Sequence, residues 1–241
     1  IPNYKNCLFD TIFIMPNHKI ITLDNLSLNE IDSEAELIPL MTPEDEEEMT
    51  KEKLPKLLPI LPLRNTVLFP GVVIPISAGR DKSIKLINDA NAAGKVIGVV
   101  SQINEEDEDP TKDDIHKIGT VAKILRVLKM PDGNVTVILQ GKKRFEISEV
   151  VSEEPYMTAT VKEVPEIRPS SQDSEFIAII DSLKELAIKI IQESPNIPSE
   201  ATFAIKNIES KSFLINFVSS NMNLSVKEKQ GLLSVNALKE P

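Results

Sequence analysis

With 241 residues, the chain is long enough for one large domain or two small ones, and a hydrophobic share of 41% is sufficient for real cores. A formal charge of −10 and the absence of tryptophan argue against a surface that neutralises nucleic-acid phosphates or stacks bases. The single cysteine, Cys7, excludes an intrachain disulfide and a thiolate metal site and fits a reducing compartment, and no apolar run of about 18 residues is present to span a bilayer.

The first 53 residues are predicted to form an acidic, poorly ordered leader. Their charge is densest from Glu44 to Glu48, and a block of like charges repels itself and buries little apolar surface. Residues 1–14 lack the basic start and long apolar run of a signal peptide, so we interpret them as non-native or upstream sequence, with Met15 as the start. The alternative interpretation of the leader is an acidic tail that docks on a basic partner.

The segment between Leu61 and Ile84 is predicted to organise the fold. Its two short apolar runs, Leu61–Leu63 and Val72–Ile76, indicate strands, and Pro70-Gly71 between them is typical of a type II turn with glycine at the positive φ. Because Pro62 and Pro75 cannot donate to a central ladder, each is expected at a strand edge, a strand start or a bulge.

A helix is predicted to follow this segment. Apolar residues recur at helical spacing after Asp81, and Gly94 is expected to end the helix.

The residues between Val96 and Val164 are predicted to form further strands. Val96–Val100 is a buried β-branched run, and Gly119–Met130 is apolar on both sides, which implies cover on both faces or a bend. Residues 131–134 predict a hairpin with Gly133 at a positive φ, and Gly141 is expected to interrupt the next strand. Six or so strands with one embedded helix predict a closed or half-closed β domain over residues 54–168, and a small barrel fits this order better than a parallel α/β sheet.

Beyond a proline-containing hinge at residues 165–171, the apolar period changes to that of helices. A first helix of about four turns is expected to open with a Ser170–Asp173 capping box and to bury one apolar stripe. This stripe consists of Phe176, Ile179, Ile180, Leu183, Leu186, Ala187, Ile190 and Ile191. Three more helices are expected, one with Pro198 in its first turn and one opened by a Ser225–Glu228 capping box.

The later helices are also assigned inward residues. These are Phe203 and Ile208, then Phe213, Leu214, Phe217 and Val218, then Leu232, Leu233 and Val235. Helices with such stripes must bury them on one another, so residues 169–241 are predicted to form a small all-α bundle. The fold class is therefore α+β, a β-rich barrel-like domain followed by helices.

The motifs of several enzyme classes are missing from the sequence. No G-x-x-x-x-G-K-[ST] phosphate loop, S-x-x-K or G-x-S-x-G motif occurs, so we expect no catalytic residue, no cofactor site and no metal site. The only histidines are His18 and His116, and we interpret both as solvated. The acidic run Glu105–Asp109 lacks the glycine of a calcium loop and is interpreted as a solvated loop. The basic run Lys142–Arg144 fits an acidic partner or a solvated strand face equally well.

The candidate binding residues flank the Pro70-Gly71 turn. They are Arg64, Val67, Leu68, Phe69, Arg80, Asp81 and Lys82. Each also has a purely local interpretation: Arg64 bonds loop carbonyls, Arg80 supports a turn and Asp81 caps a helix, while the apolar trio at 67–69 belongs to the core.

These same residues carry a resemblance to a known family. P-L-R-N-T-V-L-F-P-G at 62–71, followed by P-I and by G-R-D-K-S-I at 79–84, resembles the opening signature of the N-terminal domain of Lon, the ATP-dependent serine protease. The resemblance covers roughly Leu57 to Glu240. It continues through Gln102, Asp114, Gly119–Ala122, Ile124-Leu125, the P-D-G at 131–133, Gly141 with Arg144, and K-E-K-Q-G-L-L at 227–233.

The resemblance implies a fold and a function. The Lon N-terminal domain has a PUA-like pseudo-barrel, is not catalytic, helps to select unfolded or tagged protein substrates, and supports assembly of the ring, a hexamer. In that family an ATPase module, with ATP and Mg²⁺, and a Ser–Lys protease domain follow, and the protein is cytoplasmic. Neither module lies within these residues. The acidic leader and Asn65, where an acidic residue is common, depart from the family pattern.

Two other functions remain open at this point. The first is a stand-alone Lon-like adaptor without a protease, which the gene sequence beyond Pro241 would distinguish. The second is a PUA-like RNA binder, which requires a basic groove that the net charge argues against. We expect partners among unfolded proteins and further copies of the chain, with no nucleic acid and no membrane.

Overall fold

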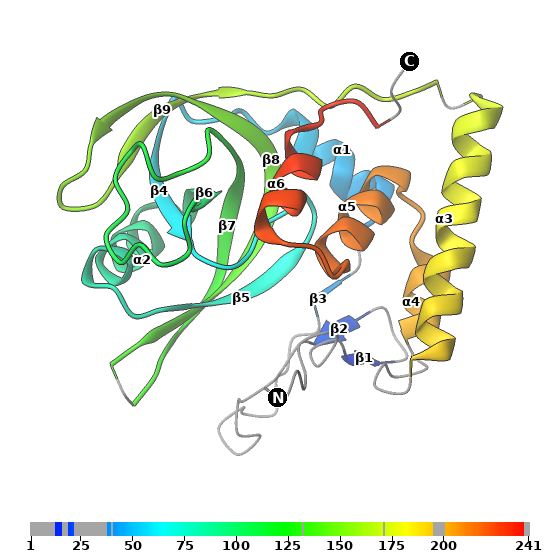
Figure 1. Cartoon of the computed structure of the whole chain (residues 1–241), viewed down its shortest axis with the longest axis horizontal. Coiled ribbons are helices and arrows are strands. Elements are labelled where there is room, and N and C mark those ends of the chain that lie inside the picture. The colour runs from blue at the N-terminus through cyan, green and yellow to red at the C-terminus, as the bar shows by residue number, and fades with distance from the viewer. Residues whose placement is uncertain are drawn as a thin grey trace. The chain divides into compact units, whose positions relative to one another are not determined.

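A computed structural model describes residues 13–15, 19–21, 38–39, 41–131, 133–170, 172–194 and 201–238. The chain divides into two compact units, and each is described by itself (Figure 1). The helical unit comprises Ile1–Asp45 and Ser170–Asn223, and the β unit comprises Glu46–Pro169 and Leu224–Pro241. Within the described ranges, the predicted α+β class is confirmed by a six-stranded mixed sheet together with six helices.

The six strands of the β unit form one strongly curved sheet. They are β4 (Leu57–Leu63), β5 (Val73–Ala78), β6 (Val96–Ser101), β7 (Ile118–Lys129), β8 (Val135–Ser152) and β9 (Thr158–Glu163). Their order is β5-β8-β7-β6-β4-β9, and a further pairing of β8 with β9 closes a ring of five strands, as the curvature in Figure 1 shows. β4 and β6 are parallel, and the connection between them contains helix α2 (Asp81–Ala93), the predicted embedded helix.

The long strand β7 serves two cores because both of its faces are covered. Its register with β8 shifts between Thr120 and Ala122 and again between Ile124 and Arg126, as expected for bulges. Ala122 and Ile124 join the core that α2 covers, whereas Val121 joins the second core. Of the two predicted alternatives, cover on both faces is therefore present, and the register shifts add bulges along the strand.

The two predicted turns have the expected backbone. Gly71 has φ 80°, and the Val72 N–H donates to the Phe69 carbonyl at 3.2 Å, as a type II turn requires. Gly133 has φ 88° in the hairpin between β7 and β8. Gly94 caps the C-terminus of α2, where its N–H donates to the Ala90 carbonyl.

Gly141 does not interrupt a strand, contrary to the prediction, because β8 runs through it without a break. The loop before β5 crosses β8 at this residue. A Cβ atom at Gly141 would lie 2.2 Å from the carbonyl oxygen of Phe69. Glycine is therefore required here by the close approach of another backbone.

Pro62 and Pro75 both lie where no ladder hydrogen bond is lost. The Leu63 carbonyl faces β6, where it accepts from the Gln102 N–H, and neighbouring residues of a strand face opposite sides, so the nitrogen of Pro62 faces away from β6. On that other side, the pairing of β4 with β9 has already ended at Pro59. Pro75 lies on β5, the strand at the open end of the sheet, as predicted.

The helical unit contains helices α3 (Ser174–Glu193), α4 (Ala201–Asn207) and α5 (Lys211–Asn221) and short strands β1 (Phe13–Met15), β2 (Lys19–Ile21) and β3 (Ile38–Pro39). Asp173 is itself the N-cap of α3 and accepts from the Phe176 N–H, so the predicted Ser170–Asp173 box is wrong. Phe203, assigned to the inside of the bundle, is exposed, whereas Ile208 is buried. Pro198, His18 and most of residues 1–14 lie outside the described residues.

The division into units differs from the predicted domain ranges 1–53, 54–168 and 169–241. Helix α1 (Pro43–Lys51) forms within the leader that was predicted to be poorly ordered, and from Glu46 onward it belongs to the β unit. Helix α6 (Val226–Ser234) begins with the predicted Ser225–Glu228 capping box but also belongs to the β unit. Gln230 on α6 donates to the Ile118 carbonyl of β7 at 2.8 Å, which holds the helix on the sheet.

The inward residues of α6 are also fewer than predicted. Leu233 is buried, but Leu232 and Val235 are exposed. The helix thus covers the sheet with a narrow face.

Candidate functional site

The loop that carries the signature residues is part of the core. Val67, Leu68 and Phe69 are all buried, so they have no accessible surface for a partner. They belong to the core, as their local interpretation predicts. The Thr120 hydroxyl donates to the Leu68 carbonyl at 2.6 Å, and the Ser101 hydroxyl donates to the Thr66 carbonyl at 2.8 Å. Side chains from two neighbouring strands therefore hold the loop in place.

Arg80 supports the loop, as its local interpretation predicts. Its guanidinium donates to the Pro62 carbonyl at 2.8 Å and to the Glu108 carbonyl at 3.3 Å. Burial, and then the charge of Arg64, lower the pKa of Arg80. Arg64 itself is exposed.

Asp81 and Lys82 stand at the start of α2 with different roles. Asp81 is exposed in the first turn, and the N-cap position belongs to Arg80, so the prediction that Asp81 caps the helix is wrong. Lys82 pairs with Asp109 at 3.0 Å and with Glu154 at 2.9 Å. Hydrogen bonds to Glu154 and Asp109 raise the pKa of Lys82. Arg80 and Lys82 thus attach the acidic loop to α2.

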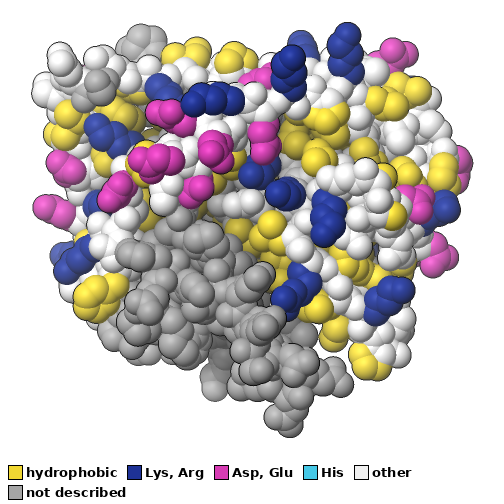
Figure 2. Space-filling view, turned by 180° about the vertical axis from the view of Figure 1, so that it is seen from behind, with side chains coloured by type: hydrophobic (Ala, Val, Ile, Leu, Met, Phe, Trp, Pro, Cys, Tyr) yellow, Lys and Arg dark blue, Asp and Glu magenta, His cyan; other side chains and the backbone are white. Residues whose placement is uncertain are grey.

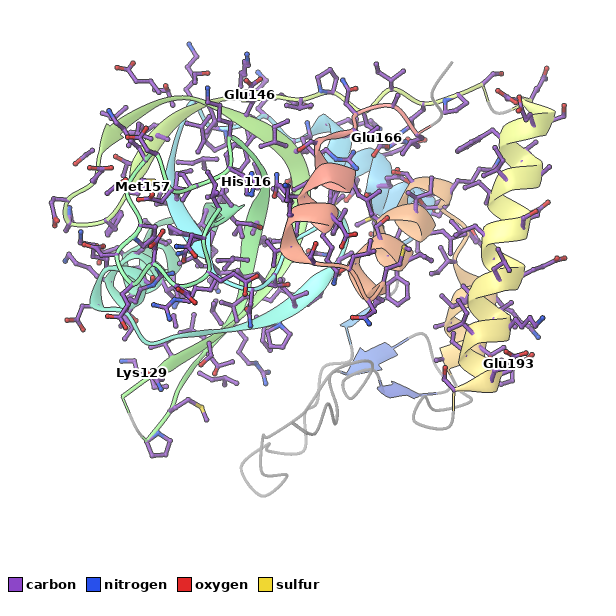
Figure 3. All side chains as sticks on the ribbon, in the orientation of Figure 1. His116, Lys129, Glu146, Met157, Glu166 and Glu193 are labelled. Atoms are coloured by element: carbon purple, nitrogen blue, oxygen red, sulfur yellow. The ribbon has the colours of Figure 1, made fainter. Side chains whose placement is uncertain are left out.

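Within the part of the chain that the structure describes, no group of three or more His, Cys, Asp or Glu side chains is placed to hold a metal ion. No helix in the same ranges is long and apolar enough to cross a membrane. His116, labelled in Figure 3, is half-buried rather than solvated, and this burial lowers its pKa.

Which apolar side chains are exposed is a surface property that the order of residues in the sequence does not reveal. On the face shown in Figure 2, hydrophobic side chains reach the surface in separate patches between charged ones. Several of the large exposed hydrophobic side chains lie on α3, so the predicted single inward stripe is wrong. Phe176, Ile180 and Ile191 are buried.

The exposed face of α3 has a regular spacing. Ile179, Leu186 and Ile190 are 51%, 59% and 56% exposed, and Leu183 between them is partly buried. Steps of four, three and four residues place these four side chains on one side of the helix. We call this set the α3 stripe. The eight apolar residues assigned to α3 make one face of ordinary width for an amphipathic helix, so no signal in the sequence distinguishes its exposed edge from its buried part.

The β unit has exposed apolar side chains as well. Leu57, Ile103 and Val151 each expose more than half of their surface. They lie on β4, on the loop after β6 and on β8, so they share no helical spacing.

Comparison with known proteins assigns the chain to a family. Residues 57–240 match the family model described as the ATP-dependent protease La (LON) substrate-binding domain. The chain is 86% identical over 226 residues to the Lon protease of Flavobacterium johnsoniae, covering 94% of this chain and 28% of that protein. It is 52% identical over 198 residues to the Lon protease of Cytophaga hutchinsonii, covering 82% of this chain and 24% of that protein. The chain thus spans about a quarter of the length of these curated relatives.

Solved structures show the same fold. The N-terminal domain of Mycobacterium avium complex Lon protease matches with a TM-score of 0.60 at 23% identity, covering 75% of this chain and 90% of that one. The Lon N-terminal domain protein from Xanthomonas campestris matches with a TM-score of 0.52 at 18% identity, covering 75% and 91%. With the family model spanning nearly all residues from β4 to the end of the chain, this protein belongs to the Lon substrate-binding domain family.

Proposed function

We propose that this chain is the non-catalytic N-terminal part of a longer Lon protease and recruits misfolded or tagged proteins for degradation in the cytoplasm. The observation that carries the proposal is the family match over residues 57–240, since the family is described by substrate binding. ATP, Mg²⁺ and the serine protease chemistry would then belong to modules that follow in the parent protein. Ring assembly of that parent, as a hexamer, is part of the same proposal.

The α3 stripe is the surface that we assign to substrate capture. Hydrophobic contact is non-directional, so it suits a binder of many different unfolded sequences. Four neighbouring apolar side chains on one helix face offer such a contact without requiring a particular partner sequence.

The expected affinity of one stripe is low. Full burial of an aliphatic side chain contributes about 1.5–3 kcal/mol, so covering the exposed halves of three side chains contributes about 2–5 kcal/mol. Because association itself also costs free energy, this gain is an upper limit, and the expected dissociation constant is about millimolar or weaker. Display of several stripes in a ring would raise the avidity without any stronger single site.

A titration with labelled, unfolded casein tests the proposal. Fluorescence anisotropy should show weak binding to the wild-type chain and a clear loss for the triple variant Ile179→Gln/Leu186→Gln/Ile190→Gln, because glutamine retains helix propensity while removing apolar surface. The matched control, Leu57→Thr/Ile103→Thr/Val151→Thr, removes three equally exposed side chains from the β unit and should bind as the wild type does. Loss in the control alone would move the surface to the β unit, and no binding to any form would refute substrate capture.

A further inference from the structure

Helix α1 is held on the β unit by basic side chains of that unit. The helix has five consecutive acidic residues, from Glu44 to Glu48, and it precedes the residues that the family model covers. Nine residues with this charge make a marginal helix on their own, since isolated helices of fewer than about 12–15 residues are unstable in water. Contacts with the β unit must therefore stabilise it.

The first contact is made by Lys143 of β8 at the C-terminal end of the helix. Its ammonium donates to the carbonyls of Thr50 and Glu52, each at 2.7 Å, and pairs with Glu163 of β9 at 3.0 Å. The Lys143 side chain is only 14% exposed, so this cation is largely removed from water. A cation at the carbonyl end of a helix also interacts favourably with the helix dipole.

The second contact is an ion-pair relay that begins inside the helix. Arg168 pairs with Glu46 of α1 and also with Glu166 at 2.8 Å. Glu166, labelled in Figure 3, in turn pairs with Arg144 of β8 at 2.9 Å. The relay therefore connects an acidic residue of the helix with a buried arginine of the sheet.

An apolar side chain of α1 is buried as well. Met49, one turn after Glu46 on α1, is only 7% exposed. Glu46 and Met49 are three residues apart, so they share a face of the helix, and that face is the one turned to the protein. Lys143 and Arg168 together make a site with a defined ligand: an acidic helix that also buries one apolar side chain, Met49.

We propose that the β unit carries a recognition site for acidic helical segments of other proteins and that α1 occupies this site as a strap in cis. Five residues, 52–56, separate α1 from β4, so the helix is present at its site at an effective concentration of roughly millimolar. A weak ligand in trans binds only when the strap is undocked. The proposed site gives a function to the basic run Lys142–Arg144, for which the sequence allowed either a partner contact or a solvated strand face. The proposal does not depend on the α3 stripe.

The first test measures the docking of α1 in the full chain. Hydrogen exchange of the amides from Glu46 to Lys51 should become about tenfold or more faster in Lys143→Gln, because a hydrogen bond to a charged group contributes about 1.5–3 kcal/mol. Lys142 is adjacent and makes none of these contacts, so Lys142→Gln should leave the exchange rates unchanged. Equal exchange in the two variants would overturn the assignment of Lys143.

The second test measures recognition in trans with a fluorescein-labelled peptide of residues 41–53. The variant Glu46→Lys/Met49→Asp undocks α1 without changing Lys143, Arg168 or any other residue outside the helix, and we expect it to bind the peptide about tenfold or more tightly than the wild-type chain does. Adding Lys143→Gln to this variant should abolish the gain in peptide affinity, whereas adding Lys142→Gln should not. The affinity of the undocked variant for the peptide should also fall as the salt concentration is raised from about 0.05 to about 0.3 M. Peptide binding that is equal in the wild type and the undocked variant, or independent of Lys143, would overturn the proposal.

Discussion

Replacing Gly141 with alanine tests the account of the β unit most sharply. The added Cβ would lie 2.2 Å from the Phe69 carbonyl oxygen and 3.0 Å from the Phe69 carbonyl carbon, and both are backbone atoms that cannot rotate away. The loop must therefore move, which disturbs the hydrogen bonds from Gly71 N–H to the Gly141 carbonyl, at 3.0 Å, and from Gly141 N–H to the Val72 carbonyl, at 2.8 Å.

The magnitude follows from these contacts. Two backbone hydrogen bonds contribute about 1 kcal/mol each, and displacing the buried Phe69 adds about 1–3 kcal/mol, as overpacked cores do. The expected loss of unfolding free energy is about 3–5 kcal/mol, or a decrease in Tm of about 10 °C for a chain of this size.

Thermal unfolding followed by circular dichroism measures this decrease. Gly231→Ala in α6 is the matched control, since a Cβ there meets no atom within 4 Å and alanine favours an exposed helix by about 0.5–1 kcal/mol. The control should be as stable as the wild type or slightly more so. A Tm for Gly141→Ala within about 2 °C of the wild type would refute the argument from backbone approach.

Three further variants probe other parts of the β unit. Pro75→Thr restores an N–H that faces the open side of β5, away from β8, and an unpaired edge N–H can pair with another chain. Analytical ultracentrifugation should then show association that increases with concentration; a monomer at all concentrations would contradict the role of Pro75 in blocking edge pairing. Thr120→Val removes the buried hydroxyl that donates to the Leu68 carbonyl, and urea unfolding should show a loss of about 1–2 kcal/mol, whereas an unchanged midpoint would count against that bond. Ser225→Ala removes the capping box of α6 and should lower the Tm by about 2–4 °C at pH 7. Hydrogen bonds from the side chain and the backbone N–H of Ser225 lower the pKa of Glu228, so the difference between wild type and Ser225→Ala should decrease as the pH falls through the lowered pKa. It should not vanish, because the Ser225 hydroxyl still accepts from the Glu228 N–H when the carboxyl is protonated; a difference at pH 2 as large as that at pH 7 would contradict the carboxylate's part in the box.

Local chemistry explains the parts of the fold that could be predicted from sequence. Gly71 and Gly133 lie at positive φ because short-range turn geometry demands it, whatever the rest of the chain does. The capping box at Ser225 is likewise decided within four residues. The alternating burial of Val135, Val137 and Leu139 follows from the period of a strand.

The features that could not be predicted depend on contacts between distant residues. The sequence pattern predicts a strand break at Gly141. The glycine is in fact required by the close approach of the Phe69 backbone, and Phe69 lies more than seventy residues earlier in the chain. The pattern of α6 shows that one face is buried but not that β7, rather than another helix, covers it. In the same way, the charges of Lys143 and Arg168 do not reveal that their partners lie in the acidic leader.

The candidate site was predicted only in part for a related reason. The apolar residues at 67–69 mark the family but lie in the core, where they shape the loop rather than contact a partner. The apolar residues of α3 are visible in the sequence, yet their period alone does not separate the buried part of the face from the exposed part.

Site-specific photocrosslinking tests the central claim most directly. A photoreactive phenylalanine analogue placed at Leu186 in the α3 stripe should crosslink unfolded casein, and the same group at the exposed Asn91 of α2 should not. Crosslinking of casein from Asn91 as strongly as from Leu186, or from neither position, would contradict capture of unfolded proteins by the α3 stripe.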